Sequence, residues 1–488
     1  MFSVIHSRRW FALSLASLAI TTVGCNGTPP PDDVTAFDFG LQCNPRCADA
    51  RDRSVDTPAE SGDDVATEDA ADAEMVDADD ATSMDVVNDD AQDAAADTVI
   101  TPDIADVFSD GHVDVPVAPG PCLALGGAVP VINEMRALSR PVYILPEPSA
   151  TPPSFAVGTH TEMAGVEDAY FFRIGSDSSL IGHWNVSEES GAVVQGGAIA
   201  GDSTNGYAMA FSSTRTGDFE VYARGITPGG PPSASFARIS NDPQFSGNAQ
   251  IVTQAGGYLV AWRSDDITTG AKTIMAAPIT NPGFVVGTPV PVTAASMVAG
   301  EFRLASNGTS AAIAYLVGSG AAFDGLAVSL GPTGAPVGTP AQFAAALPIT
   351  GSVGAVLRGS DLAVLWTSYE FASVVHGAHI DVATGTIMPR VELPSIGFNV
   401  DSISLAPDGS TEYVAGFRVD NGSSSSSAAM VRLQADLHLR DGVDRVAAAT
   451  RRGSPVNVAS LGNGTYGVAW ADDTATGTSG QVQLMVCP

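Results

Sequence analysis

The chain is poor in basic side chains, in cysteine and in charge of either sign. Only one of its 488 residues is lysine, Lys272. The chain has 22 Lys and Arg and 54 Asp and Glu, which gives a formal net charge of −32. A surface that binds nucleic acid must be basic to meet the phosphates, so this balance argues against a nucleic-acid-binding protein. Charged residues make up 16% of the chain, against about 25% in typical proteins. With 51 Gly and 32 Pro, this composition indicates many short strands and turns.

Catalytic sequence motifs are missing as well. The chain has no phosphate-binding glycine loop followed by a helix, no Gly-x-Ser-x-Gly turn and no His-Glu-x-x-His pair. His376 and His379 stand three residues apart on a predicted strand, where side chains alternate between faces, so they are expected not to share a metal. The sequence therefore predicts no cofactor and no catalytic residue set.

The acidic charge is concentrated in one part of the chain. Residues 26–120 contain 25 acidic residues and three arginines, whereas residues 121–488 contain 29 acidic and 17 basic residues. The first of these stretches also has few aromatic residues. Low hydrophobicity with high net charge predicts a disordered acidic linker, with a root-mean-square span of roughly 55 Å, before a folded domain at 121–488.

The N-terminus has the layout of an export signal over residues 1–24. Arg8 and Arg9 precede a short apolar run that ends at Ile20, and small residues follow up to Cys25. The segment Ser7–Phe11 resembles a twin-arginine signal, with an ordinary secretion signal as the alternative. The segment Val23–Cys25 resembles the lipobox of bacterial lipoproteins, in which the cysteine is acylated and becomes the mature N-terminus.

These features predict an exported protein anchored in a bacterial cell envelope through acyl chains on Cys25, with residues 25–120 as its tether. The residue after Cys25 is Asn26 and not Asp, which favours the outer over the inner membrane. The alternative is cleavage upstream of Cys25 and secretion without an anchor. Within the tether, Cys43 and Cys47 are expected to pair as a small disulfide loop, since an exported protein meets an oxidising compartment.

Residues 121–488 contain an internal repeat. Segments such as Gly206–Phe211 and Gly257–Trp262 align with one another, and each copy closes on an aromatic residue. Steps between the closing aromatics are 51 to 53 residues. A period near 50 with four short strands in each copy is typical of a β-propeller. The closing aromatics, interpreted as packing between blades, are Phe211, Trp262, Tyr315, Trp366, Phe417 and Trp470.

The number of blades and the closure of the ring follow from the two ends of the repeat region. A weaker copy upstream, with a second strand at 168–172 and a third at 180–186, brings the count to seven four-stranded blades, with six or eight as the alternatives. The last copy ends at Pro488 without a fourth strand, and residues 128–132 are expected to supply it from the N-terminal side. That arrangement would bring Cys122 beside Cys487, so these two cysteines are predicted to form a disulfide.

One stretch also resembles a known family. Residues 210–222, with the loop Ser212-x-x-Arg215-x-Gly217, resemble the repeat of TolB-type propellers, and residues 238–242 are similar to the segment that follows it there. The resemblance covers about 35 residues and implies a WD-like β-propeller in a bacterial envelope lipoprotein.

Two functions of different classes remain open. The first is a non-enzymatic module that binds a protein or a glycan on one face of the ring or in its funnel. The alternative is a secreted hydrolase or lyase whose carboxylates gather in the funnel, for example Asp265, Glu301 and Asp401. Four acids that follow closing tryptophans are weak candidates for calcium ligands, with polar turn residues as the alternative: Asp265, Asp266, Asp472 and Asp473.

Overall fold

The computed structural model describes the chain from residue 121 to residue 488. It leaves out residues 132–140, 164–165, 189–191, 242–243, 282, 295–297, 320–321, 349–350, 370–372, 395–398, 421–425, 451–454 and 475–476. The predicted signal, the acidic tether, the Cys25 anchor and the Cys43–Cys47 loop lie outside the described residues.

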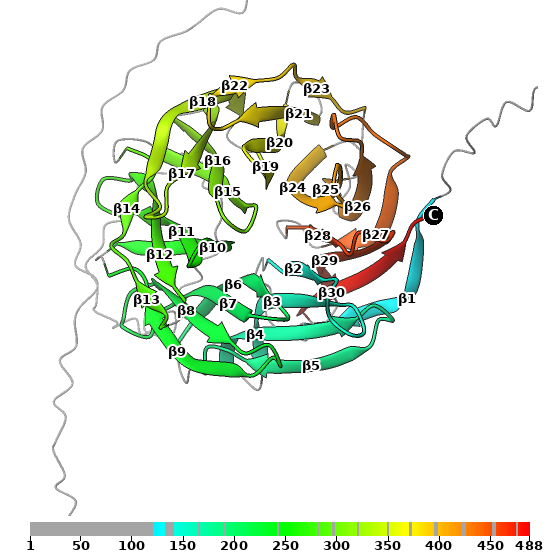
Figure 1. Cartoon of the computed structure of the whole chain (residues 1–488), viewed down its shortest axis with the longest axis horizontal. Coiled ribbons are helices and arrows are strands. Elements are labelled where there is room, and N and C mark those ends of the chain that lie inside the picture. The colour runs from blue at the N-terminus through cyan, green and yellow to red at the C-terminus, as the bar shows by residue number, and fades with distance from the viewer. Residues whose placement is uncertain are drawn as a thin grey trace, which may run out of the picture. The chain divides into compact units, whose positions relative to one another are not determined.

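Within these ranges every regular element is a strand, and no helix is long and apolar enough to cross a membrane. The strands form seven antiparallel blades around a common centre, as the repeat predicts (Figure 1). In each blade the first strand lies innermost and the fourth lies at the outer edge. The sheets of blades 3 and 4 are joined by one parallel pair, Lys272 with Val298.

The first four blades run in chain order from the inner strand outwards. Blade 1 consists of β2 (Tyr143–Glu147), β3 (Ser154–Met163), β4 (Val166–Gly175) and β5 (Leu180–Asn185). Blade 2 consists of β6 (Val194–Asp202), β7 (Gly206–Ser213), β8 (Glu220–Ile226) and β9 (Pro232–Arg238). Blade 3 consists of β10 (Phe245–Gln254), β11 (Gly257–Asp265), β12 (Lys272–Thr280), β13 (Val285–Val286) and β14 (Val290–Pro291). Blade 4 consists of β15 (Val298–Ser306), β16 (Ala311–Ser319), β17 (Ala322–Leu330) and β18 (Pro336–Pro348).

The remaining three blades complete the ring. Blade 5 consists of β19 (Val353–Arg358), β20 (Asp361–Tyr369), β21 (Ser373–Asp381), β22 (Thr386–Ile387) and β23 (Val391–Glu392). Blade 6 consists of β24 (Asn399–Asp408), β25 (Glu412–Asp420), β26 (Ser426–Leu433) and β27 (Asp444–Thr450). Blade 7 consists of β28 (Asn457–Ser460), β29 (Thr465–Thr474), β30 (Gly477–Val486) and β1 (Leu123–Pro130).

Burial explains why the second strands read as continuous apolar runs. These strands lie between two neighbours of their own sheet and between two adjacent blades, so both of their faces are covered, and all eight residues of β7 are buried. The six closing aromatics are buried too. Seven apolar clusters, one at each junction between neighbouring blades, make up the core. In one of them the Phe343 and Trp366 rings of blades 4 and 5 lie 5.0 Å apart.

The assignment of strands in blade 1 was wrong by one strand. Residues 168–172 and 180–186 belong to the third and fourth strands, β4 and β5, and the second strand is β3. Aligned on the next blade, Phe155 of β3 corresponds to Tyr207, and Thr159 takes the place of a closing aromatic. Thr159 precedes Phe211 by 52 residues, so blade 1 has the ordinary period. The repeat was missed here because its most visible residue is a threonine.

The outer strand of blade 3 is interrupted. The pieces β13 and β14 pair separately with β12. Pro289 and Pro291 have no backbone N–H to donate, and Gly287 lies between the pieces, so a continuous ladder cannot form.

Closure of the ring follows the expected plan. Strand β1 pairs antiparallel with β30, from Leu123 opposite Val486 to Pro130 opposite Gln481, and it lies at the outer edge of the last blade beside the C-terminus (Figure 1). The strand starts earlier than the predicted range of 128–132. Cys122 and Cys487 form a disulfide with their Cα atoms 4.2 Å apart. The backbone N–H of Cys122 also donates to a carboxylate oxygen of Asp444 in blade 6, at 3.2 Å.

Candidate functional site

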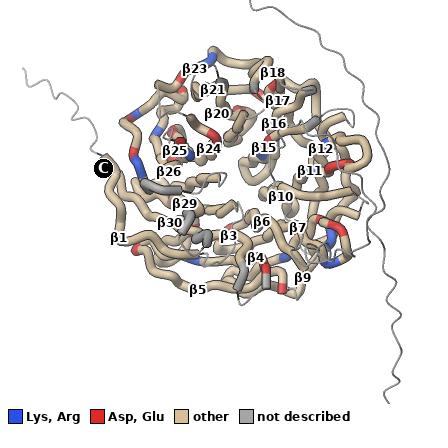
Figure 2. Tube along the Cα trace, turned by 180° about the vertical axis from the view of Figure 1, so that it is seen from behind, with Lys and Arg blue, Asp and Glu red and all other residues tan. Residues whose placement is uncertain are grey.

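The first strands of the seven blades surround a central channel. Each first strand contacts the first strands of both neighbouring blades, so the ring closes around this channel. Charged residues of both signs are spread around the ring and not gathered on one side (Figure 2). Two groups of described residues each combine two ion pairs, whereas single ion pairs lie elsewhere in the ring. One of the two groups lies in the channel and the other lies at the junction of blades 6 and 7.

In the channel, two acidic and two basic side chains form a quartet. Glu301 of β15 pairs with Arg303 of the same strand at 2.7 Å, and Asp401 of β24 pairs with Arg418 of β25. Arg303 also reaches the carbonyl oxygen of Ile403, two blades away, at 3.5 Å. The quartet therefore links blades 4 and 6 across the channel. Two of the three carboxylates suggested from the sequence, Glu301 and Asp401, belong to it.

Irregular strand pairing determines the positions of both acids of the quartet. The register of β15 against β16 shifts between Ala299 and Phe302, and that of β24 against β25 shifts between Val400 and Ser402. Glu301 lies with Gly300 inside the first shift, and Asp401 is the residue inside the second. A bulge leaves an extra residue unpaired and redirects its side chain, which explains why an alternating pattern alone does not reveal these positions.

Burial and ion pairing act in opposite directions on the two acids. Burial raises the pKa of Glu301, and the Arg303 guanidinium, the Ser352 side chain and the Val353 N–H oppose that rise. Burial likewise raises the pKa of Asp401, against the effect of Arg418. The positive charge of Arg418 also acts on Glu301, so the two acids share an electrostatic partner.

The third suggested carboxylate is separate from the quartet. Asp265, the last residue of β11, forms a two-point ion pair with Arg263 of the same strand at 2.7 and 2.9 Å. No contact among the described residues joins it to Glu301 or Asp401. Asp266 accepts the backbone N–H of Thr268 at 2.8 Å, as a turn residue does.

The positions of the other two candidate calcium ligands, Asp472 and Asp473, differ from the prediction. Asp472 and Asp473 lie within strand β29, opposite Ser479 and Thr478, and not in a loop. Their side chains lie outside the described part of the chain. Among the described residues, the grouping with metal-ligand chemistry is Cys122, Asp444 and Cys487, whose two sulfurs are bonded to each other.

The two histidines of β21 have different surroundings, as their spacing predicts. His376 lies 2.6 Å from the Ser368 hydroxyl, and burial followed by the charge of Arg390 lowers its pKa to about 4. His379 pairs with Asp361 at 2.8 Å, and this hydrogen bond raises its pKa.

A shallow groove at the junction of blades 6 and 7 is the second site. We call it the closure groove, because the end of the chain forms one of its walls. It has a volume of about 390 Å³ and lies at the end of β24 opposite to Asp401. Its lining comes from the β24–β25 turn, the β28–β29 turn, β26 with the β26–β27 connection, and the residues after β30. The lining residues are Asp408, Gly409, Ser410, Thr411, Glu412, Arg432, Arg440, Gly462, Asn463, Gly464, Tyr466, Cys487 and Pro488.

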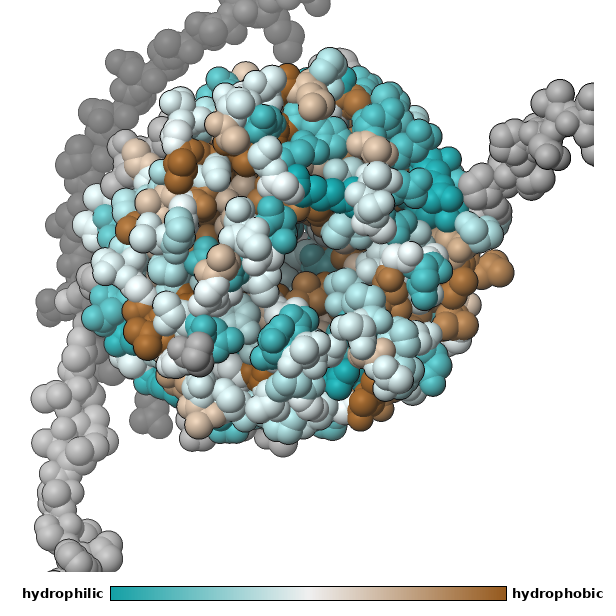
Figure 3. All heavy atoms as spheres, viewed as in Figure 1, coloured by the Kyte–Doolittle hydropathy of each residue, from teal (hydrophilic) through white to brown (hydrophobic). Residues whose placement is uncertain are grey.

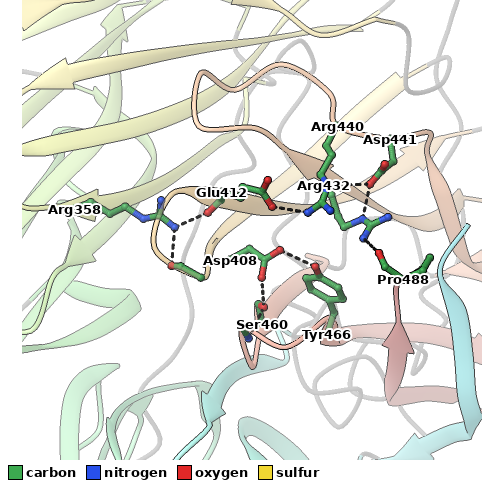
Figure 4. A network of polar contacts seen from close by, with 11 residues as sticks. Arg358, Asp408, Glu412, Arg432, Arg440, Asp441, Ser460, Tyr466 and Pro488 are labelled. Carbon is green, nitrogen blue, oxygen red and sulfur yellow. Dashed lines mark hydrogen bonds and ion pairs between the residues drawn. The ribbon is translucent and has the colours of Figure 1, made fainter. Parts of the chain in front are cut away.

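Blade 6 supplies the charged wall of the closure groove (Figure 4). The Glu412 carboxylate pairs with Arg440 at 2.5 Å, and both side chains are about one-third exposed. Arg432 is 2% exposed and pairs with Asp441 at 2.6 Å. Arg432 also donates to the main-chain oxygen of Pro488 at 3.1 Å, which holds the end of the chain against blade 6.

The floor of the groove is a hydrogen-bonded contact between the two blades. Asp408, the last residue of β24, accepts the hydroxyls of Ser460 and Tyr466 of blade 7, each at 2.6 Å. Burial and the nearby carboxylate raise the pKa of Tyr466, so its hydroxyl stays protonated and donates. The same pairing occurs between blades 1 and 2, where the Tyr207 hydroxyl donates to Glu147.

Sequence reasoning missed these tyrosines, although the repeat contains them. Each is the second residue of a second strand and lies four residues before a closing aromatic, as Tyr207 does before Phe211. The same column of the repeat holds Tyr258 and Tyr413. Arg432 and Arg440 belong to blade 6 alone, so no alignment of repeats identifies them.

The outer edge of blades 7 and 1 carries exposed apolar side chains (Figure 3, right-hand edge). Leu123 is 69% exposed, and the Ser178 hydroxyl donates to the Leu125 carbonyl at 2.7 Å, which joins the two blades there. Nothing in the described residues covers this edge. Its exposed apolar side chains are Leu123, Leu125, Leu180, Ile181 and Val486.

Comparisons with known proteins find structural neighbours with low TM-scores. No protein-family model and no curated protein matches the chain. A protein of unknown function from Dyadobacter fermentans is similar in structure, with a TM-score of 0.42 and 10% identity over 60% of this chain and 94% of its own. The polysaccharide lyase Uly1 has a TM-score of 0.43 and 8% identity over 68% and 88%. TolB from Acinetobacter baumannii has a TM-score of 0.33 and 10% identity over 68% and 79%.

These values are too low for any residue or activity to be transferred to this chain. The propeller implied by the TolB resemblance is present in the structure itself. The lipoprotein part of that resemblance stays a prediction.

Proposed function

We propose that the protein is an exported, lipid-anchored envelope protein whose propeller binds a protein or a glycan without catalysing a reaction. The acidic tether holds the propeller away from the membrane, and the closure groove is the binding site. The Arg8-Arg9 signal, the lipobox-like Cys25 and the acidic stretch of residues 26–120 support the location.

One observation carries the non-catalytic part of the proposal. General acid–base catalysis requires a carboxyl group that is free to exchange a proton with the substrate. In the channel, Glu301 and Asp401 are held by Arg303 and Arg418, and in the closure groove Glu412 is held by Arg440. Each of these carboxylates already has an arginine partner, which favours a role in binding and orienting a ligand over one in proton exchange.

The alternative is a hydrolase or lyase that uses the channel acids. The observation in its favour is that burial raises the pKa of both Glu301 and Asp401, a shift that is common among catalytic acids.

A binding and turnover experiment separates the two functions. The full-length protein is incubated with neutral and uronic-acid polysaccharides and with solubilised envelope proteins, and both retention and new reducing or unsaturated ends are measured. Saturable retention without product supports the binding module. Product formation that disappears in Glu301→Gln but persists in Asp265→Asn, which lies outside the quartet, would establish the enzyme instead.

The anchor has its own experiment. The Cys25→Ser variant is expected to leave the detergent-rich phase in a phase-partition assay, because it lacks the acylated thiol. Cys43→Ser is the matched control, since it removes a cysteine from the same segment and leaves the lipobox-like sequence intact. Equal membrane association of both variants would contradict lipid anchoring.

A further inference from the structure

We infer that the closure groove binds a neutral sugar and recognises it through neighbouring hydroxyl groups. This inference rests on the proposed binding function and narrows it to one class of ligand. It is argued from the charge balance of the lining, the placement of donors and acceptors, and the shape of the surrounding turns.

The charges of the lining balance within the protein. Two acids, Asp408 and Glu412, lie against two arginines, Arg432 and Arg440. Each has a protein partner: Glu412 with Arg440, Arg432 with Asp441, and Asp408 with two hydroxyls. A charged ligand gains little net electrostatic attraction from a lining whose two negative and two positive charges cancel, and any ligand that displaced a partner would leave a charge unpaired, which is costly. A neutral ligand leaves every pair in place.

The exposed ion pair offers a donor and an acceptor side by side. The Glu412 carboxylate and the Arg440 guanidinium are 2.5 Å apart, and both side chains are about one-third exposed. A carboxylate has about four acceptor positions and a guanidinium has five N–H donors, so one shared hydrogen bond leaves most of this capacity free. A sugar hydroxyl is both donor and acceptor. Two neighbouring hydroxyls on a sugar ring can therefore bond the carboxylate and the guanidinium together.

The surrounding turns add small polar groups and no apolar anchor point. Ser410 and Thr411 are exposed on one turn, and Asn463 is exposed on the other. Gly409 has a φ of +59°, and a Cβ built there meets no atom within 4 Å, so the groove is open on this side. Tyr466 is 1% exposed and offers no ring face.

This lining disfavours a peptide ligand. Peptide grooves hold apolar side chains in pockets or add a strand to an open sheet edge, and Pro488 with the disulfide-bonded Cys487 is too little apolar lining to form such a pocket. Its volume of about 390 Å³ lies near the lower end of small-molecule sites, which span roughly 300–1,000 Å³. The size and polarity together favour one or two sugar rings.

The test uses full-length protein and defined probes. Maltose, cellobiose and the disaccharide of N-acetylglucosamine are the neutral probes, and glucuronic acid and a polar hexapeptide are the comparison probes. Binding is measured by saturation-transfer NMR and titration calorimetry. We expect at least one neutral disaccharide to bind and neither comparison probe to do so.

Matched variants locate the binding. Thr411→Val removes one hydroxyl at nearly constant shape, and Arg440→Met removes the guanidinium. Each is expected to weaken binding by about tenfold. Thr309→Val, in the corresponding turn of blade 4, is the control and should leave the affinity unchanged. Because Thr411 and Thr309 are exposed, an unchanged melting temperature shows that both variants are folded.

Three outcomes overturn the inference. The first is that glucuronic acid or the hexapeptide binds in preference to every neutral disaccharide. The second is that a neutral disaccharide binds but Thr411→Val and Arg440→Met leave its affinity unchanged. The third is that no probe binds at all. The first and third outcomes leave the proposed binding function intact if the protein still retains an envelope component without turnover. The second outcome also contradicts the placement of the binding site in the closure groove. Turnover dependent on Glu301 would instead contradict the proposed function.

Discussion

The junction between blades 2 and 3 and the junction that closes the ring are built differently. The first is held by an apolar cluster that contains Trp262 of blade 3 and small residues of blade 2, including Ala208 and Ala210. At the closing blade, an apolar cluster is supplemented by a strand from the other end of the chain, a disulfide and the Asp408–Tyr466 hydrogen bond.

Chain connectivity explains this difference. Blades 2 and 3 are neighbours in the sequence, so packing them together restricts only the short segment that connects them. Closing the ring brings together residues 365 positions apart, Cys122 and Cys487, and the entropy cost of that loop must be offset by extra contacts. Those contacts are the pairing of β1 with β30 and the disulfide, which tie the N-terminal strand to blade 7. Cys487 also lies in the lining of the closure groove, so the groove lies beside this closure. The Asp408–Tyr466 hydrogen bond joins blades 6 and 7, which are neighbours in the sequence, and it therefore reinforces blade 7 without closing the loop.

The largest expected effect on the free energy of unfolding is at the junction of blades 2 and 3. Trp262→Ala empties a fully buried site between blades 2 and 3 and should lower the free energy of unfolding by about 3–5 kcal/mol. Ile267→Ala, at a position that is 84% exposed, is the control and should change it by less than about 0.5 kcal/mol. Denaturant unfolding measures both. Similar values for the two variants would contradict the assignment of the apolar cluster as the source of stability.

Removing the disulfide tests the closing junction. The double variant Cys122→Ser, Cys487→Ser should lose about 2–5 kcal/mol, because the unfolded chain is no longer constrained across the whole propeller. Strand β1 should then show faster amide hydrogen exchange than β6, which belongs to an interior blade. Equal exchange in the two strands would show that β1 pairing closes the ring without help from the disulfide.

Two matched Tyr→Phe substitutions compare what a single hydroxyl contributes to stability at the junction of blades 6 and 7 and at that of blades 2 and 3. Tyr466→Phe removes the hydrogen bond to Asp408 and should cost about 1 kcal/mol, since the carboxylate loses a buried donor. Tyr258→Phe is the matched variant at the junction of blades 2 and 3. Its hydroxyl makes no hydrogen bond among the described residues, so the substitution should be nearly neutral. A larger loss for Tyr258→Phe would reverse the proposed contrast.

The smallest effect concerns pH. The hydrogen bond with Asp361 raises the folded pKa of His379 above its usual 6.5, with a further contribution from Asp436. A raised histidine pKa contributes stability that is complete below the unfolded pKa and is lost as pH rises through the folded value. The wild type should therefore lose more stability between about pH 6 and pH 8.5 than His379→Gln. Parallel melting curves across this range would contradict the role assigned to the pair.

Much of the architecture could be predicted because it depends on local patterns. The aromatic residues from Phe211 to Trp470 recur at the blade period, and the missing fourth strand of the last copy implied the pairing of β1 with β30. Blade 1 was misassigned because Thr159 replaces the aromatic residue that marks the other copies.

The candidate sites could be predicted only in part. Glu301 and Asp401 were suspected as channel acids, but their arginine partners were not, because bulges in β15 and β24 decide where the acids point. The closure groove left no pattern in the sequence.

By itself, the sequence determined the repeat, the approximate strands, the closure of the ring and the concentration of acidic charge before residue 121. Spacing along one chain is enough for these features, because hydrophobic periodicity and strand order are local properties. Only the tertiary structure decided which side chains meet. Arg303 reaches Ile403 across the channel, and Arg432 reaches Pro488 at the closing blade, because curvature of the ring brings together residues that no repeat register relates.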